Sequence, residues 1–358
     1  LPEGWKRIKL GEIIIESNKS PFKVEDADNN GYYPFFTSGE AILTHSDYLV
    51  DCENLFLSTG GTAYIGYYKG KAAYSADTYA IKSKIITKYL YYFLSKQVDE
   101  ITYRYFIGSG LEHLQKDFFK KDFEILFPEN QEEQEKITEI LETVDNTIEK
   151  TNKIIEKYKR MKQGLMQELL TKGIDSNWQI RSEKTHQFKD SPLGRIPTDW
   201  EVKKLGEILN LKNGKSPNLI DSGDYVVYGS NGRIGFTNEY FLDGTFILIG
   251  RVGASGEISL ISEKSWASDN CLIGECKSYA TPAFMYYLLT FLHLKKFITQ
   301  TAQPLLTQSF LATISISFPP LPEQERIASV LSQVDAVIEK ETAYRDKLSR
   351  IKQGLMED

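Results

Sequence analysis

Two long segments of the chain carry apolar residues at the alternating four- and three-residue spacing of a heptad seam, with polar residues between them. In the first segment Thr151 and Lys162 interrupt the seam, whose positions are 137, 141, 144, 148, 151, 155, 158, 162 and 165. In the second segment Glu341, Arg345 and Lys352 interrupt it, and its positions are 327, 331, 334, 338, 341, 345, 348, 352 and 355. This periodicity predicts two long amphipathic helices.

Each predicted helix begins just after a proline-containing stretch, FPENQEEQ or FPPLPEQE, which places acidic residues at the positive end of the helix dipole. With roughly 40 residues at a rise of ~1.5 Å, either helix is about 60 Å long, far longer than the average helix of a globular domain. A helix of this length needs a partner. We expect the two copies to pair as an antiparallel coiled coil within the chain, with an approximate two-fold relation; ordinary bundle helices and zippers between two chains are the alternatives.

The two helical segments belong to a repeat that covers most of the chain. The stretch KQGLM occurs at 162–166 and again 190 residues later, and the same offset carries the Glu-Gln-Glu at 133–135 onto an identical triplet. Upstream, Trp5 and the following LGEI recur as Trp200 and a second LGEI, and SADT at 75–78 matches ASDN at 267–270. Small drifts in the offset indicate loops that changed length within a common framework.

The domain before each helix is predicted to be mixed α/β, mostly β with a few helices. Short β-branched and aromatic runs bounded by turn residues predict strands at 55–58, 63–68, 245–250 and 257–261, and closing strands at 123–127 and 314–318. One amphipathic helix is expected in each domain, at 87–98 and 282–294. The polar stretch between the halves, 172–196, is rich in Gly, Ser, Pro and charge, which suits an extended linker.

Polar, glycine-rich loops between the strands are the candidate binding elements. Small residues permit close backbone approach, and Ser, Thr, Asn, Gln and Arg can donate to and accept from base edges and phosphates. The candidate DNA-binding residues are Thr37, Ser38, Thr59, Thr62, Tyr64, Ser109, Ser230, Asn231, Arg233, Arg251, Ser255, Gln303 and Thr307. Simple turns and solvated surface arginines are the alternative interpretation of the same loops. Tyr91, Tyr92, Tyr286 and Tyr287 occupy matched helix positions and are expected in the core, not stacked on bases.

Composition and charge restrict the function only slightly. The chain has 358 residues, 41% of them hydrophobic and 26% charged, and no apolar run or leader-like N-terminus, so an intracellular, cytoplasmic protein is expected. A net charge of −6 argues weakly against nucleic-acid binding, but many acidic residues lie in the two helical segments and leave room for basic surfaces elsewhere. Three cysteines and four scattered histidines match neither a disulfide framework nor a zinc site.

No catalytic motif stands out in the sequence. H-E-x-x-H, P-loop and G-x-S-x-G patterns are absent, and the GRVGASG loop lacks the lysine and the helix of a phosphate-binding loop. The only Pro-Pro pair, Pro319-Pro320, lies at a junction between domain and helix, which argues against an adenine methyltransferase loop. The protein is therefore expected not to be an enzyme.

Arrangement and motifs together resemble the specificity (S) subunit of a type I restriction-modification system. The residues that carry this resemblance are the FPPLPEQE-type junctions, the I-x3-L-x2-V-D-x2-I seam and KQGLM, each present twice. The resemblance implies target recognition domains at 1–128 and 197–320, each reading one half of a bipartite DNA target, and conserved spacer helices at 129–171 and 321–358.

The same resemblance implies an assembly around this chain. Two methyltransferase (M) subunits would dock on the helices and restriction (R) subunits would join them, with S-adenosylmethionine, ATP and magnesium bound by these partners only. The candidate partner-binding residues are Glu133, Gln134, Lys162, Gln163, Glu323, Gln324, Lys352 and Gln353.

Two alternatives to this function remain open at the level of sequence. One is a coiled-coil scaffold whose domains bind peptide or sugar instead of DNA, and the other is a stand-alone endonuclease. The chain also departs from a perfect repeat, because QELLTKGI follows the first KQGLM segment, with its Met166, whereas the second is followed by Glu357 and Asp358. The tail after the second copy is accordingly expected to be trimmed or naturally short.

Overall fold

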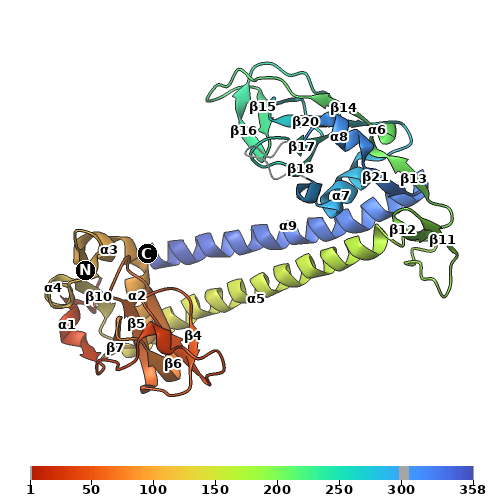
Figure 1. The fold of residues 1–358 in the computed structure, drawn as a ribbon. Helices are drawn as coiled ribbons and strands as arrows, with labels where there is room; N and C mark the ends of the chain where they lie inside the picture. Colours follow the sequence, from red (N-terminus) through yellow and green to blue (C-terminus); the bar gives the residue numbers. More distant parts are fainter. Residues whose placement is uncertain (1, 298–305, 358) are drawn as a thin grey trace. The chain divides into compact units, whose positions relative to one another are not determined.

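The structure, a computed structural model, describes residues 2–297 and 306–357 (Figure 1). The chain divides into two compact units: unit 1 consists of Leu1–Thr151 and Tyr344–Asp358, and unit 2 of Asn152–Ala343. The two predicted long helices are present as α5 (Gln131–Leu169) and α9 (Leu321–Glu357). Because the boundaries between the units fall within these helices, each helix contributes one segment to unit 1 and one to unit 2.

The core of unit 1 forms around a six-stranded sheet of order β2-β7-β5-β6-β3-β4, in which only β3 and β6 pair in parallel. Alternate residues of β5 are buried on opposite faces: Leu55 and Leu57 pack with the helix α2, whereas Phe56 joins a smaller cluster on the other face. The elements are β2 (Ile14–Glu16), β3 (Tyr33–Phe36), β4 (Leu43–His45), β5 (Val50–Ser58), β6 (Ile65–Tyr74), β7 (Thr78–Ser83) and α2 (Thr87–Lys96).

A two-stranded ladder joins the first and last strands of this domain and leads the chain into α5. The strands β1 (Trp5–Lys9) and β10 (Glu124–Pro128) are antiparallel, with Trp5 opposite Pro128. The remaining elements of unit 1 are α1 (Leu10–Ile13), η1 (Val24–Asp26), α3 (Val98–Tyr105), β8 (Phe106–Ile107), β9 (His113–Leu114) and α4 (Lys116–Asp122).

Unit 2 repeats this plan with its strands divided between smaller sheets. A four-stranded sheet of order β14-β20-β17-β18 again buries alternate residues of one strand in two clusters, and β13 and β21 form the equivalent closing ladder. The elements are β13 (Glu201–Lys204), α6 (Leu205–Ile208), β14 (Leu209–Asn213), β15 (Tyr225–Gly229), β16 (Gly232–Thr237), β17 (Phe246–Gly250), β18 (Ile258–Ile261), β19 (Ser265–Ala267), β20 (Cys271–Cys276), α7 (Pro282–Leu292), η2 (Leu294–Phe297), α8 (Gln308–Thr313) and β21 (Ser315–Phe318).

Two details differ from the predicted elements. The helix predicted at 87–98 ends at Lys96, and Gln97 separates it from a second helix, α3. The polar stretch 228–235, predicted as a loop, is largely the hairpin of β15 and β16, with only Ser230 and Asn231 in its turn. Glycine at each end of that turn allowed a tight hairpin that the polar composition concealed.

The stretch 172–196 is folded, so the prediction of an extended linker was wrong. It includes the hairpin of β11 (Phe188–Ser191) and β12 (Gly194–Pro197), and the side chain of Ile174 is only 3% exposed. Its Arg181 is also buried, in an ion pair with Glu323 at the start of α9. A few buried residues hold a segment whose average composition is that of a linker.

Candidate functional site

In unit 1, loops that are remote in sequence meet at the end of β5. The Thr59 hydroxyl donates a hydrogen bond to the carbonyl oxygen of Asp77 at 2.7 Å, and the Ser38 hydroxyl donates to the same oxygen. The backbone nitrogen of Leu114 donates to the carbonyl of Thr59 at 3.0 Å. Four segments therefore support one another in a single polar edge.

Unit 2 builds the same frame at positions 192 residues later. The backbone nitrogen of Leu306 donates to the carbonyl of Arg251 at 3.3 Å, as Leu114 does to Thr59 in unit 1. The nitrogen of Arg251 donates to the carbonyl of Asn270 at 2.8 Å. Equivalent backbone positions in the two units thus carry threonine in one case and arginine in the other.

Within residues 2–297 and 306–357, part of the hydrogen-bonding capacity of Arg251 has no partner. Its Nε atom is buried and has no hydrogen-bond partner among the described residues. The loop after Arg251 turns at two glycines with positive φ, Gly253 at 75° and Gly256 at 83°. A residue with a side chain would be strained in this backbone conformation. A buried donor without a partner is costly, so an acceptor brought by a ligand would be favourable here.

Three predicted DNA-binding residues are used by the fold itself, which argues against direct base contacts by them. The Ser255 side chain is 4% exposed and its hydroxyl donates to the carbonyl of Arg251 at 2.7 Å. Thr37 is also buried, and its hydroxyl accepts from the nitrogen of Gly39. Thr307 is the N-cap of α8, since its hydroxyl accepts from the nitrogen of Phe310 at 3.2 Å.

The other predicted residues lie on or near the surface. The guanidinium of Arg233 stacks over the ring of Phe236 at 4.0 Å from its centroid, so it is held on the β15–β16 hairpin. Gln303 falls outside the described residues. Exposed side chains among the candidates are those of Thr62, Ser109, Asn231 and Arg233, and partly buried ones are those of Ser38, Thr59, Tyr64, Ser230 and Arg251.

Each unit contains an antiparallel contact between α5 and α9, closed by a lysine of the KQGLM repeat. In unit 1, Lys352 of α9 pairs with Asp145 of α5 at 2.6 Å. In unit 2 the roles are exchanged, and Lys162 of α5 pairs with Asp335 of α9 at 2.6 Å. The side chains of both ion pairs are only partly exposed. Each lysine that interrupts the apolar seam is thus paired with an aspartate on the facing helix.

A tyrosine from the α/β domain of each unit joins the ion pair of that unit. The hydroxyl of Tyr92 donates to Asp145 at 2.9 Å, and that of Tyr287 donates to Asp335 at 2.8 Å. Burial, followed by the neighbouring aspartate, raises the pKa of both tyrosines. These two side chains are 3% and 4% exposed, which confirms the prediction that they belong to the core, and each fixes its domain to the helices.

Six of the eight predicted partner-binding residues make contacts within the chain. The buried Gln134 accepts from the nitrogen of Ile86 at 3.1 Å and donates to the carbonyl of Pro128 at 2.8 Å. Its counterpart Gln324 accepts from the nitrogen of Thr281 at 3.0 Å in the same way. The residues with such internal roles are Glu133, Gln134, Lys162, Glu323, Gln324 and Lys352. Only Gln163 and Gln353 of that set have exposed side chains.

From the sequence we did not predict the partners in these contacts, although most of the residues themselves were identified. A signal was present for Asp145 and Asp335, for the two tyrosines and for Trp5 and Trp200, because each recurs in both halves. Arg181 has no repeated counterpart within the chain, and nothing in the local sequence marks it.

Neither a metal-binding cluster nor a membrane span is found in the part of the chain that the structure describes. No group of three or more His, Cys, Asp or Glu residues there is arranged to hold a metal ion. Of the helices in residues 2–297 and 306–357, none is both long and apolar enough to cross a membrane.

Comparison with known proteins gives one consistent family. A model described as type I restriction modification DNA specificity domain matches residues 2–160 and 197–350. The chain is 27% identical to the type I restriction enzyme MjaVIII specificity subunit of Methanocaldococcus jannaschii, over 99% of this chain and 92% of that protein. It is 24% identical to the EcoDI specificity subunit of Escherichia coli, over 98% and 86% of the two chains.

The fold has been seen before in a solved structure. The S subunit of a type I restriction-modification system from M. genitalium superposes with a TM-score of 0.77 at 18% identity, covering 98% of this chain and 95% of that chain. At this level of identity the likeness shows a shared fold and not shared residue roles.

Proposed function

Since this chain belongs to the type I restriction-modification DNA specificity family, we propose that each of its two recognition domains reads one half of a bipartite duplex target. The observation that carries this proposal is the duplicated loop frame around Thr59 and Arg251. The equivalent backbone hydrogen bonds hold Thr59 in unit 1 and Arg251 in unit 2. One fold can in this way read two unlike half-sites.

The two side chains suit different base edges. An arginine can contact the O6 and N7 of guanine with two hydrogen bonds, or a phosphate oxygen, whereas a threonine hydroxyl can donate or accept and its methyl can contact thymine. The Nε of Arg251, which has no partner among the described residues, is consistent with a contact of that kind. The helices that connect the domains would set the number of unread base pairs between the half-sites, of the order of one DNA turn of ~34 Å.

A glycine on the surface of each long helix supports the docking of a partner. Gly164 and Gly354 lie inside helices, where glycine costs roughly 1 kcal/mol relative to alanine. A Cβ placed on either would meet no atom within 4 Å outside the neighbouring turns of its own helix. Each is preceded by an exposed glutamine, Gln163 or Gln353. Close approach by another chain is a physical reason for a glycine that internal packing does not require, and its duplication supports two copies of one partner.

We expect alanine at Gly164 and Gly354 to separate stability from assembly. The double variant should gain up to about 1 kcal/mol of helix stability per site and lose at least about ten-fold in affinity for the methyltransferase subunit. Thermal unfolding and titration calorimetry with the purified methyltransferase measure the two effects. Lys157→Ala, on an exposed position of α5, is the matched control and should change neither by a comparable amount. Unchanged affinity in the double variant would show that the partner docks elsewhere.

In this assembly the chain recognises the DNA target and contributes no catalytic group. S-adenosylmethionine, ATP and magnesium would be bound by two methyltransferase subunits and by restriction subunits that join them. The support for this division is the sequence, which carries no cofactor-binding or catalytic motif, and the specificity subunits that the chain resembles.

Salt dependence distinguishes DNA reading from a scaffold with peptide- or sugar-binding domains. A complex that neutralises about four phosphates should lose affinity log-linearly with salt, with a slope of about −3.6. The measurement is a titration of duplex DNA into the chain and its methyltransferase at several salt concentrations. A slope near zero would favour the scaffold, and cleavage of DNA by the chain alone with magnesium would favour the stand-alone endonuclease.

A further inference from the structure

A short hairpin of unit 1, formed by β8 and β9, carries exposed apolar side chains at its tip, residues 107–112. Phe106 and Leu114 pair across the hairpin and are 4% and 6% exposed, so they fix its base in the core. Ile107 and Leu111, in contrast, are 56% and 64% exposed. Because the hydrophobic contribution of a side chain scales with the area removed from water, the fold gains little from these two residues.

The hairpin is attached to the loop frame that carries Thr59. The backbone nitrogen of Gly61 donates a hydrogen bond to the carbonyl of Glu112 at 2.9 Å. A Cβ built on Gly60 would lie 3.8 Å from the Cδ2 atom of Leu111, so this leucine lies beside the backbone that follows Thr59. The apolar tip and the polar edge therefore form one continuous surface.

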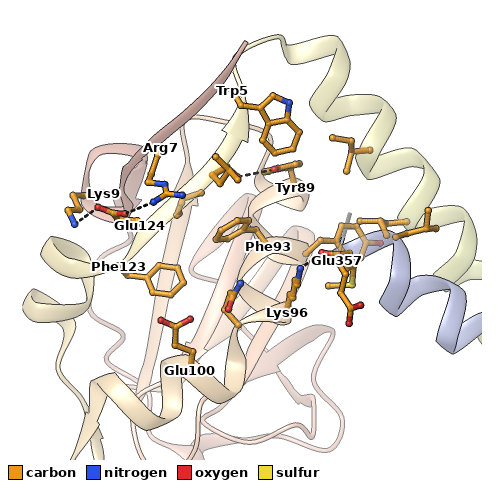
Figure 2. A pocket seen from close by; sticks show the side chains of 18 of the residues that line it. Trp5, Arg7, Lys9, Tyr89, Phe93, Lys96, Glu100, Phe123, Glu124 and Glu357 are labelled. Atoms are coloured by element: carbon orange, nitrogen blue, oxygen red, sulfur yellow. Dashed lines mark hydrogen bonds and ion pairs between the residues drawn. The ribbon is translucent and has the colours of Figure 1, made fainter. Parts of the chain in front are cut away.

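The helix α3, which precedes the hairpin, borders two cavities. The larger, of about 820 Å³, has Glu100 of α3 at its edge, and this carboxylate is paired with Arg104 at 2.6 Å (Figure 2). The smaller, of about 660 Å³, is lined by Tyr103 of α3 and by Thr62 and Glu112. Since this second cavity lies between α3 and the hairpin, the tip borders open space on that side and can approach a ligand.

The charge of the tip does not suit the DNA backbone. Residues 106–114 contain no Lys or Arg, and their one carboxylate, that of Glu112, is exposed. A phosphate repels a carboxylate and is bound chiefly by cations and hydrogen-bond donors. The base edges in the major groove present a single methyl group, the C5 methyl of thymine, which apolar side chains contact. An apolar tip without cations therefore suits a thymine better than the backbone.

We propose that Leu111, with Ile107 beside it on the tip, contacts the C5 methyl of a thymine in the first half-site from the major groove. This inference rests on the proposed function, since it names one base that unit 1 specifies. The Thr59 hydroxyl donates its hydrogen to the carbonyl of Asp77, so it can only accept a hydrogen bond from a base. The apolar tip adds a contact that this hydroxyl does not provide.

The test removes one methyl group at a time from the DNA. The first half-site is taken from the mapped methylation motif, and each of its thymines in turn is replaced with deoxyuridine, which lacks only the C5 methyl. Binding of these duplexes to the chain with its methyltransferase subunit is measured by titration. At one thymine the affinity should fall about four-fold, as expected when one methyl group is withdrawn from apolar contact.

Substitutions in the tip show whether Leu111 makes this contact. Leu111→Ala should bind the thymine and deoxyuridine duplexes equally tightly, whereas Leu111→Met keeps an apolar side chain and should keep most of the preference. Neither change should unfold the domain, because the side chain is largely exposed. Ile15→Ala is the matched control and should retain the preference, since it truncates a half-exposed residue that pairs with Lys82 near the far end of β7.

Several results would overturn the inference and leave the proposed function intact. One is a preference for thymine that persists in Leu111→Ala, because the methyl group would then act through another side chain or through DNA stiffness. Another is a first half-site without thymine on either strand. A third is weaker binding of Leu111→Ala to the methyltransferase with no preference for thymine, which would assign the tip to a protein partner. A complex that prefers neither half-site would overturn the inference and the proposed function together.

Discussion

Glu323→Gln should lower the free energy of unfolding of unit 2 by about 3 kcal/mol, because it leaves a buried guanidinium without its principal charge partner. The side chain of Glu323 is 2% exposed and holds Arg181, Trp200 and Ile174 together. Asp199 remains within 3.0 Å of the guanidinium, but it is half exposed and contributes less. The measurement is urea unfolding followed by circular dichroism.

The duplicated chain supplies its own control for this effect. Glu133→Gln changes the matched residue of unit 1, which is partly exposed and bonded to Trp5 alone among the described residues, so its cost should stay below about 1 kcal/mol. A further Arg181→Met substitution should recover part of the stability lost in Glu323→Gln, since it removes the stranded charge. Equal losses for Glu133→Gln and Glu323→Gln would contradict the assigned role of the arginine.

Arg251→Ala should weaken binding to the second half-site by about 5- to 150-fold, the range expected when about 1 to 3 kcal/mol of base contact is lost. The guanidinium lies on a backbone frame fixed by Leu306 and Asn270, so truncating it removes the contact without removing the loop. Binding is measured with duplexes in which one half-site at a time is replaced by unrelated sequence.

A substitution at Thr59, the position in unit 1 that matches Arg251, distinguishes effects on the two half-sites. Thr59→Ala should affect only the first half-site, and Arg233→Ala, whose guanidinium is stacked on Phe236, should affect the second less than Arg251→Ala does. If Arg251→Ala leaves the preference at both half-sites unchanged, the loop frame is not the reading element of unit 2.

The architecture could be predicted from the sequence because the repeated pattern depends only on residues that are close together in the chain. A heptad seam needs only residues three and four positions apart, and the seam positions are indeed buried or partly buried along nearly the whole of both helices. Leu355, in the last turn of α9, is the exception, with 42% of its side chain exposed. The strands were predictable for the same reason, since alternate burial along β5 and β17 follows from residues two positions apart.

The repeat alone does not show whether a repeated residue contacts its own chain or another subunit. Lys162, Gln134 and Glu323 recur because each fixes a recognition domain or the facing helix, and a contact with another subunit would have produced the same signature. Arg181 was missed because its partner lies 142 residues away in the sequence. Pairings of that separation leave no periodicity in the local sequence.

The loops were the least predictable part of the candidate site. Ser255, Thr37 and Thr307 have the residue types of DNA contacts, yet their hydroxyl groups complete turns and a helix cap. Small hydroxyl side chains serve both purposes equally well, so composition cannot separate them. Only the arrangement of the backbone shows that Thr59 and Arg251 occupy equivalent positions.

The central claim, that the two domains read two halves of one DNA target, is tested most directly by mapping modified adenines in the host genome with and without this gene. We expect a split motif, two short specified blocks around a fixed unread gap, that disappears on deletion and returns with the intact gene. The Arg251→Ala gene should return a motif in which only one block is relaxed. A modification pattern that is unchanged by deletion, in cells that express the methyltransferase subunit, would contradict the claim.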